Sequence, residues 1–345
     1  MRTLNLAILG YGNTGRAFGK LLTEKMPEIM KKYDTKVNVT AIATKTKGTL
    51  VCREGIDLVK IEGDLAERGK FTDGMTKSAL EVAESAEYDV LIELTPLEIF
   101  SGQPATDHVK AALRRGKHAI TANKGPIAWA FRELRDMARE NDCLFFYETT
   151  VMDGTPVFNL IDYALKMCNV TEIKGILNST TNFILEELAK GIPYDDIIEE
   201  GKRRGFVEAD PAMDVEGWDS AAKVTALMNV LMDAGLTPRE IDRKGIEDIT
   251  PDMILDAKKR GKAIRLLCGG KIENGQAKGY VKPEEVDQND LLAAITGTTS
   301  VVSVTTDLMG TVSIVEHDPE IEQTAYGVLS DTLRVISTLC PSGVS

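Results

Sequence analysis

A carboxylate and an ammonium four residues apart are the strongest candidates for chemistry in this sequence. Asp219 and Lys223 lie in a pattern that predicts a helix over Asp219–Ala234, so their side chains share one face and can meet. A surface salt bridge is the common outcome of this spacing. The small and apolar neighbours favour a partly buried face instead, where a paired lysine can protonate an alkoxide formed by hydride transfer.

A glycine-rich turn near the N-terminus is a candidate dinucleotide site. It reads Gly10-Tyr11-Gly12-Asn13-Thr14-Gly15. The turn follows a strand-like run, Thr3–Leu9, and precedes a helical pattern, Arg16–Lys32. Glycines let the backbone approach a pyrophosphate, and the helix N-terminus supplies N–H donors and positive potential. An ordinary tight turn is the alternative, but the strand before it and the helix after it favour cofactor binding.

The end of the second strand-like run bears on the choice of nicotinamide cofactor. Enzymes that use NAD place a carboxylate there, whereas those that use NADP place basic groups. Here Lys45 and Lys47 follow Val37–Thr44, and no carboxylate is present. Two surface lysines without a ligand are the alternative. The sequence favours NADP, with NAD as the other candidate, and Lys45 is the predicted phosphate partner.

Two further motifs directly follow strand-like runs. They are Glu93-Leu94-Thr95-Pro96 and Thr121-Ala122-Asn123-Lys124-Gly125-Pro126. Ligands of open parallel sheets bind outside the carboxyl ends of the strands, so both motifs are expected to face the cofactor. Each could be a simple turn, but Lys124 just beyond a buried strand is expected close to the nicotinamide.

The elements that must position these motifs alternate between strand and helix in the first half of the chain. Such alternation, with apolar strands, is typical of a parallel sheet covered on both faces, and it predicts an α/β Rossmann domain. The expected strands are Thr3–Leu9, Val37–Thr44, Asp89–Leu94, Lys117–Thr121 and Cys143–Glu148, and the expected helices include Arg16–Lys32, Gln103–Arg115 and Ile127–Glu140.

After Glu148 the pattern changes to that of a second, α+β domain. Asn274-Gly275 separates two strand-like runs and is a strong hairpin signal. The expected helices are Val157–Lys166, Asp219–Ala234 and Thr324–Thr338, and the expected strands are Thr171–Leu177, Ala263–Ile272, Ala277–Val281, Val301–Thr305 and Gly310–Val315.

Length and charge limit the class of protein. A chain of 345 residues, 43% hydrophobic and 27% charged, fits two globular domains. The net charge of -12 argues against a binder of nucleic acid or of anionic membranes, because such surfaces are usually basic. No apolar run approaches the roughly 20 residues of a membrane span, and Met1–Gly10 lacks the pattern of a cleavable signal.

The cysteines and histidines make zinc chemistry and a histidine-based triad poor candidates. The five cysteines are scattered and form no C-x-x-C pair, and the three histidines lack ligand spacing. Free thiols are typical of a reducing compartment. The expected location is the cytoplasm.

Several motifs, in their order along the chain, resemble the homoserine dehydrogenase family. The resemblance covers Asn5 to Asp331, and the block from Gly205 to Lys223 is far more specific than the glycine turn. The motifs are Glu93–Pro96, Thr121–Pro126, Tyr147–Val151 with Pro156, Ile176–Leu185, and the block Gly205–Lys223 with Glu208, Asp214 and Asp219.

The resemblance implies an enzyme that interconverts L-aspartate 4-semialdehyde and L-homoserine with NAD(P)H, in threonine, methionine and isoleucine biosynthesis. It implies a Rossmann domain at residues 1–148, an α+β domain for substrate binding and dimerisation at 149–318, and a C-terminal helix at 319–345 that returns to the Rossmann domain. A homodimer is expected. The chain resembles a short form without a regulatory domain, so threonine feedback through such a domain is not expected.

The resemblance also implies roles for single residues. Lys223 would donate the proton in the reducing direction and act as the base in reverse. Asp219 and Glu208 would hold polar groups of homoserine, Glu208 its ammonium; Thr180 would contact the substrate, and Lys124 would lie beside the reacting oxygen. The cofactor would be lined by Tyr11, Asn13, Thr14, Thr95, Lys124 and Gly205, in addition to Gly10, Gly12, Gly15 and Lys45.

In this family the loop after the Rossmann strands can also bind a monovalent cation, Na⁺ or K⁺, through backbone carbonyls. The matching positions are Glu148, Val151, Asp153 and Thr155.

The sequence departs from the family pattern at two places. Ser179 stands where the family usually has glycine in the substrate turn, so the approach of the backbone to the substrate is in question. Val315–Pro319 lacks the glycine-rich pattern that usually precedes the last helix, which puts the C-terminal cofactor contacts in question.

Two other functions stay open on these residues. One is another two-domain Rossmann oxidoreductase that acts on an amino acid or a sugar, although such folds do not share the block from Glu208 to Lys223. The other is a non-catalytic NADP(H)-binding sensor, which would be expected to lose the polar centre that this chain keeps.

Overall fold

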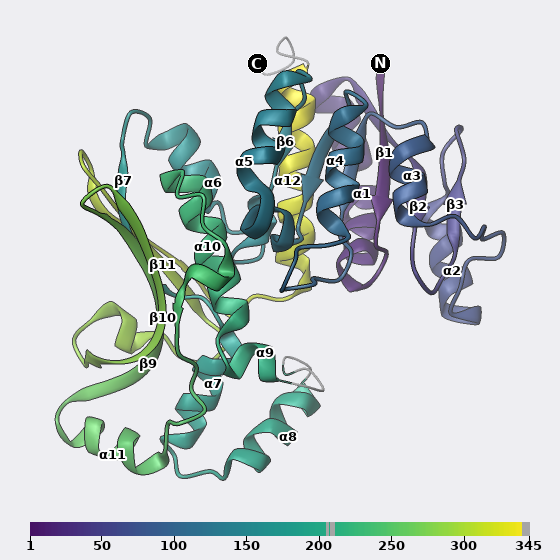
Figure 1. The fold of residues 1–345 in the computed structure, drawn as a ribbon. Helices are drawn as coiled ribbons and strands as arrows, with labels where there is room; N and C mark the ends of the chain where they lie inside the picture. The colour runs from purple at the N-terminus through teal and green to yellow at the C-terminus, as the bar shows by residue number, and fades with distance from the viewer. Residues whose placement is uncertain (205–206, 208–210, 340–345) are drawn as a thin grey trace. The chain divides into compact units, whose positions relative to one another are not determined.

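The computed structural model of the protein describes residues 1–204, 207 and 211–339. The chain divides into two compact units (Figure 1). The first is Met1–Pro156 together with the segment that begins at Glu320, and the second is Val157–Pro319. Two predicted site residues, Gly205 and Glu208, lie outside the described part of the chain.

A six-stranded sheet in the order β3-β2-β1-β4-β5-β6 forms the centre of the first unit. Its neighbouring strands are parallel except β2 and β3, which are antiparallel. The predicted α/β class is confirmed; β3 was not predicted, and β6 is shorter than expected. The strands are β1 (Arg2–Leu9), β2 (Thr35–Ala43), β3 (Thr49–Val51), β4 (Val90–Glu93), β5 (His118–Thr121) and β6 (Phe145–Phe146).

Helices cover both faces of this sheet because side chains along β1 alternate between two cores. Leu6 and Ile8 pack with α1 and α12, whereas Ala7 and Leu9 pack with α3 and α4. The helices are α1 (Asn13–Tyr33), α2 (Leu58–Arg68), α3 (Ala79–Ser85), α4 (Ala105–Arg114), α5 (Lys124–Glu140) and α12 (Ile321–Leu339), with a 3₁₀ turn at Glu148–Thr150.

A second six-stranded sheet, in the order β12-β11-β7-β9-β10-β8, forms the second unit. Asn274 and Gly275 join β9 to β10 with φ values of 51° and 77°, the two positive angles that a tight two-residue hairpin turn favours. The predicted hairpin is confirmed. The strands are β7 (Val170–Ile176), β8 (Asp242–Arg243), β9 (Lys262–Glu273), β10 (Gln276–Asp287), β11 (Ser300–Thr306) and β12 (Gly310–Glu316).

Helix α10 packs on this second sheet through buried apolar side chains. A Cβ at Gly279 of β10 would lie 3.3 Å from Cγ1 of Val224, so glycine allows the helix its close approach. The helices of this unit are α6 (Val157–Asn159) with a π-helical turn (Leu160–Ala164), α7 (Ser179–Leu188), α8 (Tyr194–Arg204), α9 (Ala212–Val215), α10 (Trp218–Met232) and α11 (Pro251–Lys259), with 3₁₀ turns at Pro238–Glu240 and Leu291–Ala294.

Candidate active site

The glycine turn lies between β1 and α1, with a different task for each glycine. Gly10 has a φ of 92°, and a Cβ there would lie 2.4 Å from the carbonyl oxygen of Leu94. A Cβ on Gly15 would lie 2.7 Å from the carbonyl oxygen of Gly10. At Gly12 a Cβ would meet nothing within 4 Å. Open space beside Gly12, at the start of a long helix, fits the approach of a pyrophosphate.

Tyr11 contributes its backbone rather than its side chain to this turn. The ring is 1% exposed and packs edge-on against Phe71. Burial, and then the nearby Glu62 carboxylate, raise the pKa of the Tyr11 phenol well above its ordinary value. The Tyr11 carbonyl oxygen accepts a hydrogen bond of 2.5 Å from Nζ of Lys47.

Lys47, and not Lys45, has its ammonium against the glycine turn. Lys45 is exposed, whereas Lys47 is half-buried, and burial with the nearby Arg16 lowers the pKa of Lys47. Arg16, in the first turns of α1, is paired with Glu62 at 2.7 Å. From the sequence, Lys45 was the predicted phosphate partner, Lys47 counted only as a second basic residue, and Arg16 had no assigned role. The sequence feature that could have indicated Lys47 is Thr44. Its hydroxyl accepts the Lys47 N–H at 2.8 Å and so folds the segment back.

The loops after β4 and β5 lie at the same edge as the glycine turn, because Leu9, Glu93 and Thr121 pair side by side. Glu93 is fully buried and accepts hydrogen bonds from the backbone N–H of Thr95, at 2.7 Å, and from its hydroxyl. Nδ2 of Asn123 donates to the Thr95 carbonyl oxygen at 2.9 Å. Both predicted motifs therefore meet at the carboxyl edge.

Glu93 has a second buried partner, and Lys124 begins a helix. Nδ1 of His108, on α4, lies 2.6 Å from the Glu93 carboxylate, and both side chains are buried. Lys124 is the first residue of α5, which Asn123 caps by accepting the N–H of Gly125 at 2.9 Å. His108 had no predicted role, because nothing in its spacing from Glu93 indicates the contact.

The loop from Glu148 to Thr155 is held by the C-terminal helix α12. The backbone N–H of Glu148 donates to the Asp331 carboxylate at 3.0 Å, and the Thr324 hydroxyl donates to Asp153 at 2.8 Å. Met152 and Asp153 have φ values of 56° and 51°, so two successive residues adopt the left-handed conformation. This is an uncommon backbone that turns successive carbonyls in new directions.

In the second unit Lys223 and Asp219 form the expected contact on α10. Their Nζ and Oδ2 atoms are 3.0 Å apart, and their side chains are 19% and 15% exposed. Nζ of Lys223 also donates to the carbonyl oxygen of Leu177 at 2.7 Å. The pair therefore lies on a partly buried face and not on an open surface.

Thr180 lies in the first turn of α7, shortly after the Asn178 that caps this helix. Its side chain is 4% exposed, and Ser179 is the first residue of the helix. Asn178 caps α7 and donates to two carboxylates, those of Asp214 and Asp219. The sequence analysis quoted Asn178 within a motif but gave it no function.

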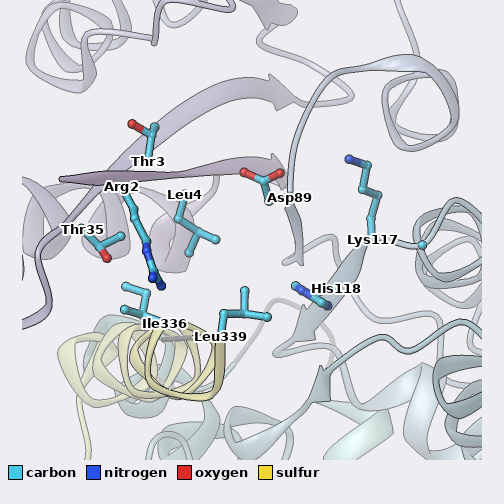
Figure 2. Close-up of a pocket in the computed structure, with 10 residues that line it drawn as sticks. Arg2, Thr3, Leu4, Thr35, Asp89, Lys117, His118, Ile336 and Leu339 are labelled. Carbon is cyan, nitrogen blue, oxygen red and sulfur yellow. The ribbon is translucent and has the colours of Figure 1, made fainter. Parts of the chain in front are cut away.

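Figure 2 shows a pocket of about 360 Å³ at the other edge of the first sheet. Arg2, Asp89 and His118 line it, at the amino ends of β1, β4 and β5. Asp89 accepts the backbone N–H of Asn5 at 2.8 Å, which joins neighbouring strands. Because the glycine turn lies at the carboxyl ends of the strands, this pocket is separate from it.

Two general findings concern the described residues as a set. They contain no group of three or more histidine, cysteine, aspartate or glutamate side chains placed to hold a metal ion, and no helix long and apolar enough to cross a membrane. The cysteines among them, Cys52, Cys143, Cys168 and Cys268, are free thiols.

Comparison with known proteins identifies the family. A family model described as "Homoserine dehydrogenase, NAD binding domain" matches residues 10–148, and a second, described as "Homoserine dehydrogenase", matches residues 156–333. The chain belongs to the homoserine dehydrogenase family. The predicted family is therefore confirmed.

Relatives of similar length support this family over nearly the whole chain. Homoserine dehydrogenase of Methanocaldococcus jannaschii is 33% identical over 97% of this chain and 99% of its own length. The NAD(+)-dependent homoserine dehydrogenase of Pseudomonas canavaninivorans is 34% identical, over 97% of each chain.

Solved homoserine dehydrogenases share the fold. One from Thiobacillus denitrificans has a TM-score of 0.84 and 26% identity, over 99% of this chain and 75% of its own. A hyperthermophilic archaeal homoserine dehydrogenase in complex with NADPH has a TM-score of 0.82 and 28% identity, over 98% of each chain.

The activity of this chain is accordingly that of a homoserine dehydrogenase, an oxidoreductase with a nicotinamide cofactor. This enzyme belongs to amino-acid biosynthesis. The predicted homoserine dehydrogenase activity is confirmed over the two alternatives, another two-domain Rossmann oxidoreductase and a non-catalytic NADP(H)-binding sensor.

Proposed function

We propose that Lys223 is the acid–base residue of the homoserine dehydrogenase reaction. The observation that supports this role is the position of its Nζ, 2.7 Å from the Leu177 carbonyl and 3.0 Å from Asp219, on a partly buried face. Both contacts stabilise the ammonium form. When L-aspartate 4-semialdehyde is reduced, the developing oxyanion takes a proton from Nζ; when L-homoserine is oxidised, neutral Lys223 takes the hydroxyl proton. The bound nicotinamide supplies or accepts the hydride.

We propose four further residues around the substrate. Asp219 orients Lys223 and contributes negative charge for the ammonium of homoserine. Glu208, which lies outside the described residues, is proposed by resemblance to bind that ammonium. Thr180 is a proposed substrate contact at the start of α7. Lys124 is a proposed second cation for the oxyanion, because it begins α5 at the carboxyl edge of the parallel sheet.

We propose that the cofactor lies along Gly10–Gly15, with Thr95, Lys124 and Gly205 as further contacts, and that NADP is preferred. The preference is supported by two lysines after β2, with no carboxylate in Ala43–Gly48. Lys47 is the better phosphate partner, because its ammonium already lies against the glycine turn. Both cofactors occur among similar homoserine dehydrogenases, since the archaeal relative was solved with NADPH and the Pseudomonas relative is NAD(+)-dependent.

A monovalent cation, Na⁺ or K⁺, is proposed for the loop held by α12. Its ligands would be the carbonyl oxygens of Glu148, Val151, Asp153 and Thr155. The successive left-handed residues Met152 and Asp153 support this proposal, because they turn neighbouring carbonyls away from a regular helix or strand.

The proposed domain roles follow the two units. The first unit would bind the cofactor, and the second would bind the substrate and carry the contacts of a homodimer. The free thiols support a cytoplasmic location, since reducing compartments keep cysteines unpaired. Neither a nucleic acid nor a membrane is a proposed partner.

The decisive experiment follows nicotinamide absorbance while the purified protein oxidises L-homoserine with NADP or with NAD. We expect Lys223→Ala to lose roughly 10²–10⁴-fold in kcat, the usual contribution of an acid–base residue. Lys190→Ala is the matched control, because Lys190 is a half-exposed lysine of the same unit, paired with Glu187. Full activity of Lys223→Ala would exclude the proposed role.

A further inference from the structure

A buried asparagine lies among the carboxylates beside Lys223, and the roles proposed above leave it without a task. Asn178 is 5% exposed and follows β7 by two residues. It is the N-terminal cap of α7. The cap accounts for the amide oxygen of Asn178, but not for its amide nitrogen.

The amide nitrogen of Asn178 joins two acidic side chains from two other helices. Nδ2 donates to Oδ1 of Asp214, on α9, at 2.6 Å. It also donates to Oδ2 of Asp219, on α10, at 3.0 Å. That same Oδ2 lies 3.0 Å from Nζ of Lys223. One carboxylate oxygen is therefore shared between the asparagine and the proposed acid–base lysine.

The amide oxygen fixes the orientation of this side chain. Oδ1 of Asn178 accepts from the backbone N–H of Thr181 at 2.8 Å and lies 3.0 Å from the Thr181 hydroxyl oxygen. Turning the amide over would place Oδ1 against two carboxylates and Nδ2 against an N–H donor. Only one orientation satisfies all of these contacts.

Charge explains why an amide is needed here. Asp214 and Asp219 are held near one another by a single nitrogen, and two carboxylates in one site repel each other. An N–H donated to each carboxylate offsets part of that repulsion without adding a charge of its own. The amide thus holds Asp219 in a defined place next to Lys223.

We propose that Asn178 is a positioning residue of the reaction: its amide holds the Asp219 carboxylate against Lys223 and ties Asp214 to the same centre. The inference rests on the proposed acid–base role of Lys223. Asn178 acts through Asp219 and needs no contact with substrate or cofactor.

The test separates the cap of α7 from the donor to the carboxylates. Serine and aspartate cap helices about as well as asparagine, so Asn178→Ser and Asn178→Asp should each keep the Thr181 contact. Both remove the amide donor, and Asn178→Asp adds a third negative charge. Asn178→Ala loses the cap as well as the donor, so its difference from Asn178→Ser gives the cost of losing the cap.

We expect kcat to fall about ten- to a hundredfold in Asn178→Ser, which is part of the acid–base contribution, with the KM for NADP unchanged. In Asn178→Asp the added charge should also move the Lys223 limb of the pH–rate profile to higher pH, because a carboxylate favours the ammonium. Circular dichroism gives the folded fraction to which each rate is referred.

Wild-type kcat and an unmoved pH profile in both variants would overturn the inference. So would activity that falls only as far as the folded fraction falls. Loss in Lys223→Ala with full activity in both Asn178 variants leaves the acid–base proposal standing and removes only this one. Full activity in Lys223→Ala removes the acid–base role itself.

Discussion

At the scale of single residues, the short turn after β2 determines which of two lysines lies against the glycine turn. The Thr44 hydroxyl accepts the Lys47 N–H and donates to the Gly48 carbonyl at 2.9 Å. This closes the turn after β2 and brings Lys47 back to the Tyr11 carbonyl, whereas Lys45 stays exposed. Basic character at this position was therefore predictable from composition, but the identity of the lysine was not.

This assignment predicts that Lys47→Ala raises the KM for NADP while the KM for NAD changes little. A charged hydrogen bond to the 2′-phosphate contributes about 1.5–3 kcal/mol, or roughly ten- to a hundredfold in affinity. Lys45→Ala is the matched control and should leave the ratio of the two KM values near that of the wild type. Steady-state kinetics with both cofactors give the answer. A loss of NADP affinity in Lys45→Ala alone would restore the original assignment.

The contact between Asp219 and Lys223 was predictable for a simpler reason. Asp219 and Lys223 are four residues apart in one helix, so the helical repeat alone brings them together. Asn178 reaches the same carboxylate across 41 residues of chain. The sequence alone carries no sign of that approach.

At the scale of elements, the sequence predicted the strands and turns that have a regular pattern, but not the short or irregular strands. The parallel strands and the Asn274-Gly275 hairpin each have a strong local signal. Strand β3 has only three residues, Thr49–Val51, which is too short for any periodicity to show. Strand β6 has two residues, because Glu148–Thr150 turns into a 3₁₀ helix.

Helix α4 illustrates how one element fixes a loop on another. His108 brings its Nδ1 to the buried Glu93 carboxylate, whose other oxygen holds Thr95 at the end of β4. We predict that His108→Leu lowers the free energy of unfolding by roughly 3 kcal/mol, because it leaves a buried carboxylate oxygen unsatisfied. The KM for the cofactor should rise as well, since the Thr95 loop loses its support.

His108→Asn is the control for that prediction, because its amide N–H can take the place of Nδ1–H. Denaturant unfolding and cofactor kinetics are measured on both variants. Equal stability and equal KM in His108→Leu and His108→Asn would show that the hydrogen bond to Glu93 does not support the loop.

At the scale of the whole molecule, the chain closes the first unit with its last described helix. Val328, Leu329, Val335 and Ile336 of α12 lie in the same core as α1 and β1. The apolar face of this helix is visible in the sequence, but the surface that it covers lies more than 150 residues away in places, as the 183-residue separation of Glu148 and Asp331 shows. The periodicity of the sequence predicts which face of α12 is buried, but not the surface against which that face packs.

Asp331, which joins α12 to the loop at Glu148, makes the stability of the protein depend on pH. Burial, opposed by Arg334, raises the pKa of Asp331 to about 6 from 3.8. The folded protein therefore binds this proton more tightly than the unfolded chain. The stability gained from the protonated carboxyl is fully present below about pH 4 and is lost as the pH rises through about 6.

We predict that Asp331→Asn, an uncharged group of the same shape that can still accept the Glu148 N–H, removes this pH dependence. Relative to the wild type, the variant should gain about 3 kcal/mol in unfolding free energy between about pH 4 and pH 7, since each pKa unit corresponds to about 1.4 kcal/mol. Denaturant unfolding at several pH values measures both proteins, with Asp248→Asn as an exposed control. If the plots of unfolding free energy against pH are parallel for wild type and Asp331→Asn, the prediction is wrong. The Asp331 carboxyl would then have the same pKa in the folded and unfolded chains, and its ionisation in the folded protein would cost no stability.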